Sequence, residues 1–413
     1  MGSNDQLFTP RFFWMCGFSF TVFLSAFQLF PTAPYRVLQL GGGPFAAGLV
    51  LGFLTYGSAL SAPFTGALAD RLGRRRTLVV VSVVLAGFAV AYATVEAVWV
   101  LLVVVLVHGV FWSALLSASG AYITEVMPES RRAEGISYWG MASTLAVAVA
   151  PSLGLLLVDR GWTWVCVSIG VLNLTMAAIA WQMPDDRPQH GVHAGTWREV
   201  FSREALEWRV TLLAVTLFLY CFGYGGVTSF VALYAETQGV ARGAWFAVFS
   251  ATVLLSRPFS GRLADRLGHV RTFLPCIALT VLAYALLALA NSRATFLASA
   301  ALFGVGFGSA YPIFAAFVMK HVGSARRGAA FGGILAALDT GIGSGSMVLG
   351  WVIQHYGFRP AYGLGAVLAA LAIPYFLLVR PVFLRGRAGG IGLAPGASTS
   401  STGSGAFVDS RSG

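Results

Sequence analysis

One acidic residue, Asp339, lies deep inside an apolar stretch of the chain. It stands alone in the run Gly328–Phe358, 12 residues past Arg327. Because an α-helix rises about 1.5 Å per residue, Asp339 would sit roughly 15–20 Å from that arginine, near the middle of a bilayer. An ionised carboxylate at that depth costs about 2.5–3.5 kcal/mol or more, so the group should face protein or water and favour its neutral form. Such a carboxyl group can carry a proton between two sides of a membrane; a structural aspartate bonded to a neighbouring helix is the alternative.

A histidine occupies a similar depth in another apolar stretch. His108 lies near the middle of the run Ala97–Thr124. An imidazole exchanges protons near neutral pH, so His108 is the second candidate for proton coupling. The alternative is a lone membrane histidine whose ring bonds to a backbone carbonyl, and the sequence leaves both interpretations open.

The chain lacks the residue patterns of the common enzyme classes. It contains no paired carboxylates, no His/Cys cluster with metal-ligand spacing, no nucleophile elbow and no Gly-x-x-x-x-Gly-Lys loop for ATP. Its four cysteines fall inside apolar runs at spacings that suit neither a metal nor a redox pair. We therefore expect no catalytic residue, no metal site and no cofactor, with a proton gradient as the energy source.

The composition indicates a membrane protein. Of 413 residues, 57% are apolar and 10% are charged, whereas a soluble domain carries about 25% charged residues. The net charge of +11 does not indicate nucleic-acid binding, because the basic residues lie in short loops and leave no groove-sized basic face. A membrane span needs about 20 apolar residues. The twelve predicted spans are Phe12–Tyr35, Val37–Ala69 (with its helix starting near Pro44), Thr77–Val95, Ala97–Thr124, Gly135–Val158, Gly161–Pro184, Val210–Ala235, Ala244–Gly261, Thr272–Ser292, Ala294–Met319, Gly328–Phe358 and Pro360–Val379.

A charged segment occurs twice. Ser61–Leu78 and Ser256–Phe273 are identical at 12 of 18 positions and lie 195 residues apart, and the same offset relates Gly109 to Gly304. A repeat at that distance makes the chain two copies of one six-span unit, which predicts two parallel bundles. The predicted divisions are an N-terminal bundle, 1–184, a cytoplasmic linker, 185–209, a C-terminal bundle, 210–385, and a disordered Gly/Ala/Ser/Thr-rich tail, 386–413.

The distribution of positive charge predicts the orientation in the membrane. If the repeated segment is cytoplasmic, 21 of the 27 Lys and Arg residues fall on that side or in the termini. Arg257 lies at a membrane edge. The positive-inside rule therefore places both termini in the cytoplasm. The arginines on the outer side are Arg36, Arg160, Arg242, Arg293 and Arg359.

The repeated segment resembles the signature of the major facilitator superfamily of secondary transporters. Its first copy follows the pattern Gly-x-Leu-Ala-Asp-Arg-x-Gly-Arg-Arg-x-x-Leu, and its second copy is nearly complete. The resemblance covers about residues 11–385 and implies twelve transmembrane helices in two pseudo-symmetric six-helix bundles. The matching residues are Gly66, Leu68, Ala69, Asp70, Arg71, Gly73, Arg74, Arg75 and Leu78.

The second half narrows the resemblance. The segments Gly306–Pro312, Arg326–Ala330 and Asp339–Gly343 are similar to bacterial efflux permeases grouped with arabinose, drug or metallophore exporters. This chain departs from two motifs that proton-coupled exporters carry. Val105 stands where those exporters place an arginine, and the Gly-Pro motif of span five is reduced to Ala150-Pro151.

The resemblance implies a cytoplasmic gate. Asp70 would be attracted by the helix amides near Gly328 in the other bundle, by about 0.3–1 kcal/mol, which favours the outward-open state. The alternative is that the arginines only set topology. The gate residues that we predict are Asp70, Arg71, Arg74, Glu125, Arg131, Asp265, Arg266 and Arg271.

In this family spans one, four, seven and ten line a central cavity. Aromatic faces and polar groups on those spans would suit an amphipathic organic molecule; lipid-facing or core packing is the alternative for each aromatic. The predicted cavity residues are Gln28, Trp112, Ser113, Tyr220, Tyr224 and Tyr311.

The resemblance and the residues together predict a proton-coupled exporter of a small organic or drug-like solute. It would work as a monomeric, multi-pass antiporter in the bacterial cytoplasmic (inner) membrane, by alternating access. A proton symporter for uptake has the same fold and stays an alternative. A transport-inactive receptor is disfavoured, because no soluble signalling module accompanies the spans.

Overall fold

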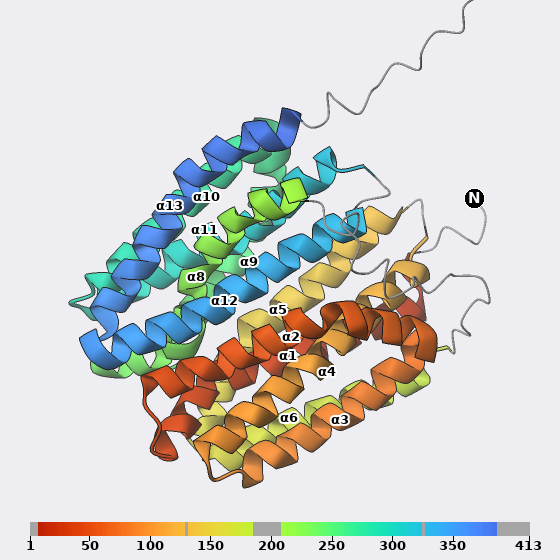
Figure 1. The fold of residues 1–413 in the computed structure, drawn as a ribbon, viewed down its shortest axis with the longest axis horizontal. Helices are drawn as coiled ribbons and strands as arrows, with labels where there is room; N and C mark the ends of the chain where they lie inside the picture. Colours follow the sequence, from red (N-terminus) through yellow and green to blue (C-terminus); the bar gives the residue numbers. More distant parts are fainter. Residues whose placement is uncertain (1–6, 129–130, 185–207, 324–326, 386–413) are drawn as a thin grey trace, which may run out of the picture.

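The structure, a computed structural model, describes residues 7–128, 131–184, 208–323 and 327–385. Side chains at 63, 67, 70, 132, 133, 137, 258 and 327–329 are not described. The predicted linker falls almost wholly outside these ranges, and the tail lies outside them. Within them the chain forms twelve α-helices in two groups of six (Figure 1). The prediction of an all-α membrane fold with two six-helix bundles is confirmed.

The first bundle contains α1 (Pro10–Gln39), α2 (Pro44–Leu72), α3 (Arg74–Thr94), α4 (Val98–Val126), α5 (Arg132–Val158) and α6 (Trp162–Gln182). The second contains α8 (Trp208–Thr237), α9 (Ala244–Leu267), α10 (His269–Ala288), α11 (Arg293–His321), α12 (Arg327–Tyr356) and α13 (Phe358–Arg385). Eleven of these helices contain a stretch long and apolar enough to cross a membrane, and α9 has a shorter apolar stretch, Ala244–Arg257. α8 begins at Trp208, two residues before the predicted start of the second bundle.

The duplicated segment forms the same tight turn in both bundles. A single residue, Gly73, separates α2 from α3, and Gly268 separates α9 from α10. Both glycines have positive φ angles, 88° and 93°, which side chains rarely tolerate. The repeat in the sequence is therefore a repeated one-residue connection between two antiparallel helices.

The two bundles also repeat their internal packing. A Cβ atom on Gly109 of α4 would collide with the carbonyl oxygen of Leu54 on α2. A Cβ atom on Gly304 of α11 would collide with Thr252 and would lie 2.6 Å from the carbonyl oxygen of Phe249 on α9. Leu54 and Phe249 are separated by the same 195 positions as the two glycines. The offset in the sequence therefore corresponds to equivalent helix crossings, at which only glycine lets the backbones approach.

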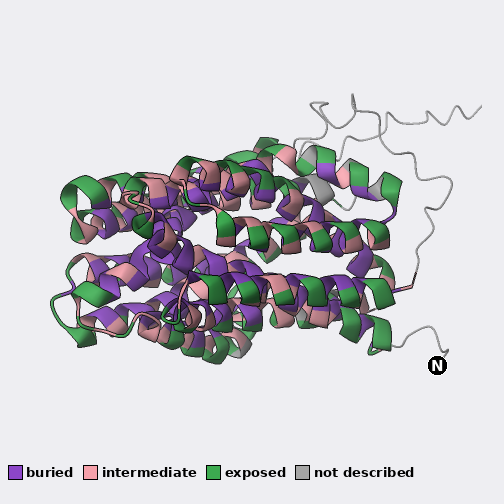
Figure 2. Cartoon of the chain, turned by 90° about the horizontal axis from the view of Figure 1, so that it is seen from below, coloured by how far each residue is buried: buried purple, intermediate pink, exposed green. Residues whose placement is uncertain are grey.

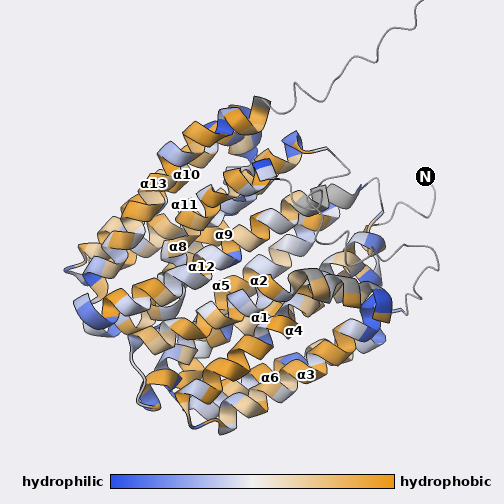
Figure 3. Ribbon diagram, in the orientation of Figure 1, coloured by the Kyte–Doolittle hydropathy of each residue, from blue (hydrophilic) through white to orange (hydrophobic). Residues whose placement is uncertain are grey.

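The helices run alternately between two ends of the molecule. The Gly73 end carries the turns at Gly73 and Gly268 together with the first and last described residues. The Arg242 end carries the connections 40–43, 95–97, 159–161, 238–243, 289–292 and 357. Hydrophobic residues cover the length of the helices, and hydrophilic residues gather at the two ends (Figure 3). This distribution fits a bilayer around the middle of the molecule.

Candidate functional site

The two bundles pack closely through α2 and α12 near the Arg242 end. A Cβ atom on Gly52 would lie 2.5 Å from the side chain of Met347. The Tyr56 hydroxyl lies 2.7 Å from the hydroxyl of Ser344. Close backbone approach and these contacts hold the bundles together on this side, and buried positions gather between them (Figure 2).

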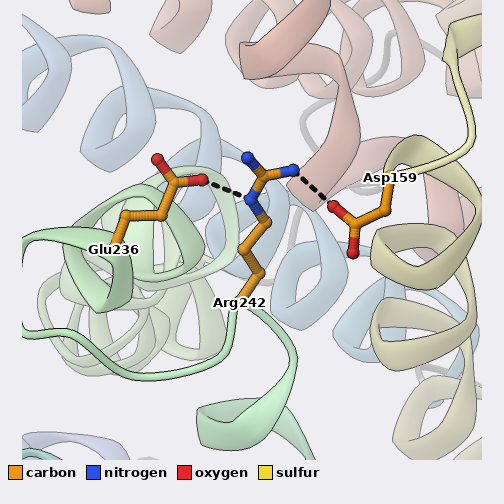
Figure 4. A network of polar contacts seen from close by, with 3 residues as sticks. All are labelled: Asp159, Glu236 and Arg242. Atoms are coloured by element: carbon orange, nitrogen blue, oxygen red, sulfur yellow. Dashed lines mark hydrogen bonds and ion pairs between the residues drawn. The ribbon is translucent and has the colours of Figure 1, made fainter.

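A charged cluster completes the closure at this end. Arg242, in the connection before α9, donates a hydrogen bond to Glu236 of its own bundle and another to Asp159 of the first bundle, at 2.5 Å (Figure 4). Its guanidinium also lies over the ring of Tyr35 on α1, 4.8 Å from the centroid. Burial alone would lower the pKa of Arg242, but Tyr35 and the two acidic side chains outweigh it and raise this pKa. We call Asp159, Glu236 and Arg242 the clamp.

Two glycine pairs show that the bundles part toward the Gly73 end. Gly48 and Gly66 are 18 residues, or five turns, apart and so lie on one face of α2. A Cβ on Gly48 would collide with the Ser346 carbonyl of α12, whereas one on Gly66 would meet no described residue within 4 Å. On α12, Gly350 lies against Pro44, while Gly332, five turns earlier, likewise meets no described residue. The interface therefore opens between these levels.

The contact between α5 and α9 opens in the same direction. Near the Arg242 end the Ser250 hydroxyl donates to the carbonyl oxygen of Ala148, which is 3% exposed. Met141, seven residues and about two turns before Ala148, lies on the same face of α5 but is 59% exposed. We call this space between α2, α5, α9 and α12 the opening.

Asp339 lies on the wall of the opening. It is seven residues before Ser346, which lies against Gly48 of α2 and whose hydroxyl lies 2.8 Å from that of Ser229 on α8. Asp339 therefore shares the inner face of α12, between α2 and α8. The side chain is half-buried and forms no ion pair with a described residue. Cys221 of α8 and Tyr311 of α11 lie close enough to interact with its charge. One carboxyl group of α12 thus lies near residues of α8 and α11, and no cation neutralises it among the described residues.

His108 lies elsewhere, inside the first bundle. Its Nδ1 lies 2.6 Å from the Tyr92 hydroxyl, and its ring stacks on Phe88 with centroids 5.2 Å apart. A small cavity of about 10 Å³, roughly what one water molecule needs, separates it from Ser25 and Asn173. Only residues of α1, α3, α4 and α6 line this cavity. The structure therefore does not bring the two predicted proton carriers together.

Of the six predicted cavity residues, Tyr311 is the one beside Asp339. Gln28, Ser113 and Trp112 make contacts within the first bundle: the Gln28 amide bonds to Ser168 and to the Leu24 carbonyl, Ser113 pairs with Thr65, and Trp112 packs on Phe23. Tyr220 and Tyr224 stack on Phe307, with centroids 5.0 and 4.2 Å apart. Substrate contact by these five side chains stays a prediction.

The predicted gate lies at the Gly73 end and is described only in part. The side chains of Asp70 and Gly328 lie outside the described residues. Arg74 pairs with Glu125. Arg131 forms two 2.9 Å hydrogen bonds to Glu134. Arg71, Asp265, Arg266 and Arg271 are exposed.

Sequence reasoning missed two features of the site. Asp159 and Arg242 are charged positions in short connections at the Arg242 end, and Glu236 lies in the last turn of α8. Their types and spacing give no sign that Asp159 and Arg242 meet. Arg257 was expected at a membrane edge, and it is the last residue of the apolar stretch Ala244–Arg257 of α9. Sequence reasoning missed the direction of its side chain, which faces α5.

The described residues form twelve long helices in two bundles that meet at one end and part at the other, which defines a helical membrane protein of the transporter class. The chain belongs to the Major Facilitator Superfamily, whose profile matches residues 14–246 and 240–401. This membership places it among the secondary transporters, multi-pass membrane proteins that move small molecules.

Several known proteins are similar over most of the chain. An uncharacterised MFS-type transporter of Pseudomonas aeruginosa (strain UCBPP-PA14) is 29% identical over 350 residues, 81% of this chain and 84% of the relative. The staphylopine export protein of Staphylococcus aureus (strain Mu50) is 23% identical over 84% of this chain and 90% of the relative. The solved nucleoside transporter NupG has a TM-score of 0.71 at 15% identity, covering 91% of this chain and 99% of that one. A bacterial homologue of the human lysosomal transporter Spinster, in an inward-facing and occupied conformation, has a TM-score of 0.71 at 16% identity, covering 93% and 98%.

Proposed function

We propose that the protein is a proton-coupled exporter of a small organic solute in a bacterial cytoplasmic membrane. The observation that carries the proposal is Asp339, a half-buried carboxyl group on the inner face of α12 with no ion pair among the described residues. A carboxyl group in that position favours its neutral form yet can reach water through the opening. It can therefore change its protonation state as its exposure changes.

Alternating access supplies that change of exposure. In the conformation described, the bundles are closed at the Arg242 end and open toward the Gly73 end. The positive-inside rule makes the Gly73 end cytoplasmic, so Asp339 would release its proton to the cytoplasm in this state. Opening at the other end would expose the carboxyl group to the outer, more acidic side, where it would be protonated. Export as the direction is supported by the similarity to the staphylopine export protein of Staphylococcus aureus.

The test is transport by the purified protein in lipid vesicles with an imposed pH gradient. A screen of labelled organic solutes identifies one that the wild-type protein moves against proton flow. Asp339→Asn is expected to abolish gradient-driven accumulation of that solute while sparing passive exchange. Glu96→Gln neutralises an exposed carboxylate in the 95–97 connection and serves as the matched control.

Two results would contradict the proposal. Full gradient-driven accumulation by Asp339→Asn would remove this residue from proton coupling. Accumulation of the solute in the direction of proton flow would replace the exporter with a symporter for uptake.

A further inference from the structure

The structure contains a second charged side chain between the bundles, Arg257 on α9. It is half-buried, and its Nε atom is buried without a hydrogen-bond acceptor. It forms no ion pair or side-chain hydrogen bond with any described residue. An arginine side chain stays protonated in proteins, so this is a permanent positive charge without a counter-ion among the residues that the structure describes.

The face of α9 that carries Arg257 looks into the opening. Phe249 and Val253 face α11, where they lie against Gly304 and Gly308. Ser250 lies on the adjacent stripe and bonds to Ala148 of α5. Arg257 follows Ser250 by seven residues, about two turns, and so continues the stripe that faces α5.

α5 and α9 are no longer in contact at the depth where Arg257 lies. Because the two helices run in opposite directions, the position opposite Arg257 is found seven residues before Ala148, at Met141. Met141 is 59% exposed, although Ala148 is 3% exposed. Arg257 therefore points into space that the other bundle does not fill in this conformation.

An unpaired arginine in this setting is costly. Arg257 ends the apolar stretch Ala244–Arg257, and its half-buried guanidinium gives up hydration without gaining a counter-ion among the described residues. A hydrophobic residue of similar volume would avoid that cost. The planar guanidinium matches a carboxylate through two parallel hydrogen bonds, which makes an organic acid its natural partner.

We propose that Arg257 binds the carboxylate of an organic anion that the protein transports. The inference rests on the proposed transport function and specifies its substrate class. The anion enters the opening between α5 and α9 and neutralises the arginine. Asp339 stays available for the proton.

Binding can be tested separately from transport. The full-length protein in a neutral detergent is heated with benzoate, salicylate, succinate or glutamate, each compared with its amide. We expect at least one carboxylate to raise the Tm when its amide does not. Arg257→Gln should weaken that binding by about tenfold or more, and Arg257→Lys by less. Arg262→Gln, which changes an exposed arginine on the same helix, should bind as the wild type does.

A second measurement separates a binding role from a structural one. Without any anion, Arg257→Gln should raise the Tm, because it removes a charge that no described residue neutralises. A lower Tm for this variant would indicate a structural role and overturn the proposal. So would equal stabilisation by each carboxylate and its amide, or full carboxylate binding by Arg257→Gln.

The remaining outcomes distinguish the two proposals and the source of the anion. The protein could bind carboxylates through Arg257 and show no proton-driven flux. That result would overturn the transport proposal, and the proposal of a carboxylate site at Arg257 would stand. Proton-driven flux of neutral solutes alone would overturn the binding site and leave the transport proposal. Stabilisation by short-chain phosphatidic acid beyond that of every carboxylate would assign Arg257 to a lipid headgroup and overturn the substrate assignment.

Discussion

Arg242 in the second bundle and Asp159 in the first bundle form a hydrogen-bonded ion pair across the closed end of the molecule, with Nη1 and Oδ1 2.5 Å apart. Glu236 holds the same guanidinium from the other side. The pair bridges the two bundles where α5 and α8 end, at the Arg242 end. It must therefore break when the bundles separate at the Arg242 end.

Removing this pair should favour opening at that end. Asp159→Asn takes away one charge of a partly exposed pair, which is worth about 0.2–1 kcal/mol, so the ratio of the two conformations should shift by up to about fivefold. The measurement is the distance distribution between spin labels on Glu96 and Asn291, which lie in the connections before α4 and α11 at this end. Arg160→Gln, a change of the adjacent exposed residue, should leave the distribution unchanged. An unchanged distribution for Asp159→Asn would show that the clamp does not bias the equilibrium.

Valine in place of glycine should have opposite effects on the conformation at Gly48 and at Gly66, two positions on one face of α2. Gly48→Val would force a side chain against the Ser346 carbonyl and should open the Arg242 end. Gly66→Val meets open space among the described residues in the present conformation, so this state should persist. If closure at the Gly73 end brings α12 over Gly66, the same variant should be unable to close there and should lose transport. The spin-label distances used for the clamp separate the two variants, and identical distributions would refute the assignment of the closed end.

We predict a structural role for His108. Its ring is held by the Tyr92 hydroxyl and by Phe88 inside the first bundle, so Tyr92→Phe or His108→Leu leaves a buried partner unsatisfied, at about 1–3 kcal/mol. Thermal unfolding should show a lower Tm for both variants. Gradient-driven flux should survive in whatever fraction stays folded. An unchanged Tm together with lost proton coupling in His108→Leu would instead make the imidazole a proton carrier.

The repeat was predictable from the sequence because the two copies of a short charged segment stand out between apolar runs. The start of α2 at Pro44 and the turn at Gly73 follow from residues whose backbone preferences are strong. The position of Asp339 midway along its helix follows from counting residues. Its place on the inner face of α12, beside Tyr311 and Cys221, does not follow from counting.

The direction in which each helix faces could not be predicted because lipid and protein core are both apolar. His108 and Asp339 lie at similar depths in similar apolar runs, yet one is enclosed within its own bundle and the other faces the opening. Arg257 and the clamp show the same limit. Arg242 meets Asp159, and Arg257 faces α5, although both Asp159 and α5 are far away in the sequence.

By itself, the sequence determined the number of helices, the duplication, the family and the depth of each charged residue. These properties depend on apolar length and on local backbone chemistry, which neighbouring residues decide. The tertiary structure decided which end is closed and which side chains face the space between the bundles. Those properties depend on where distant helices approach closely enough to touch, as α2 does through Gly48 and does not through Gly66.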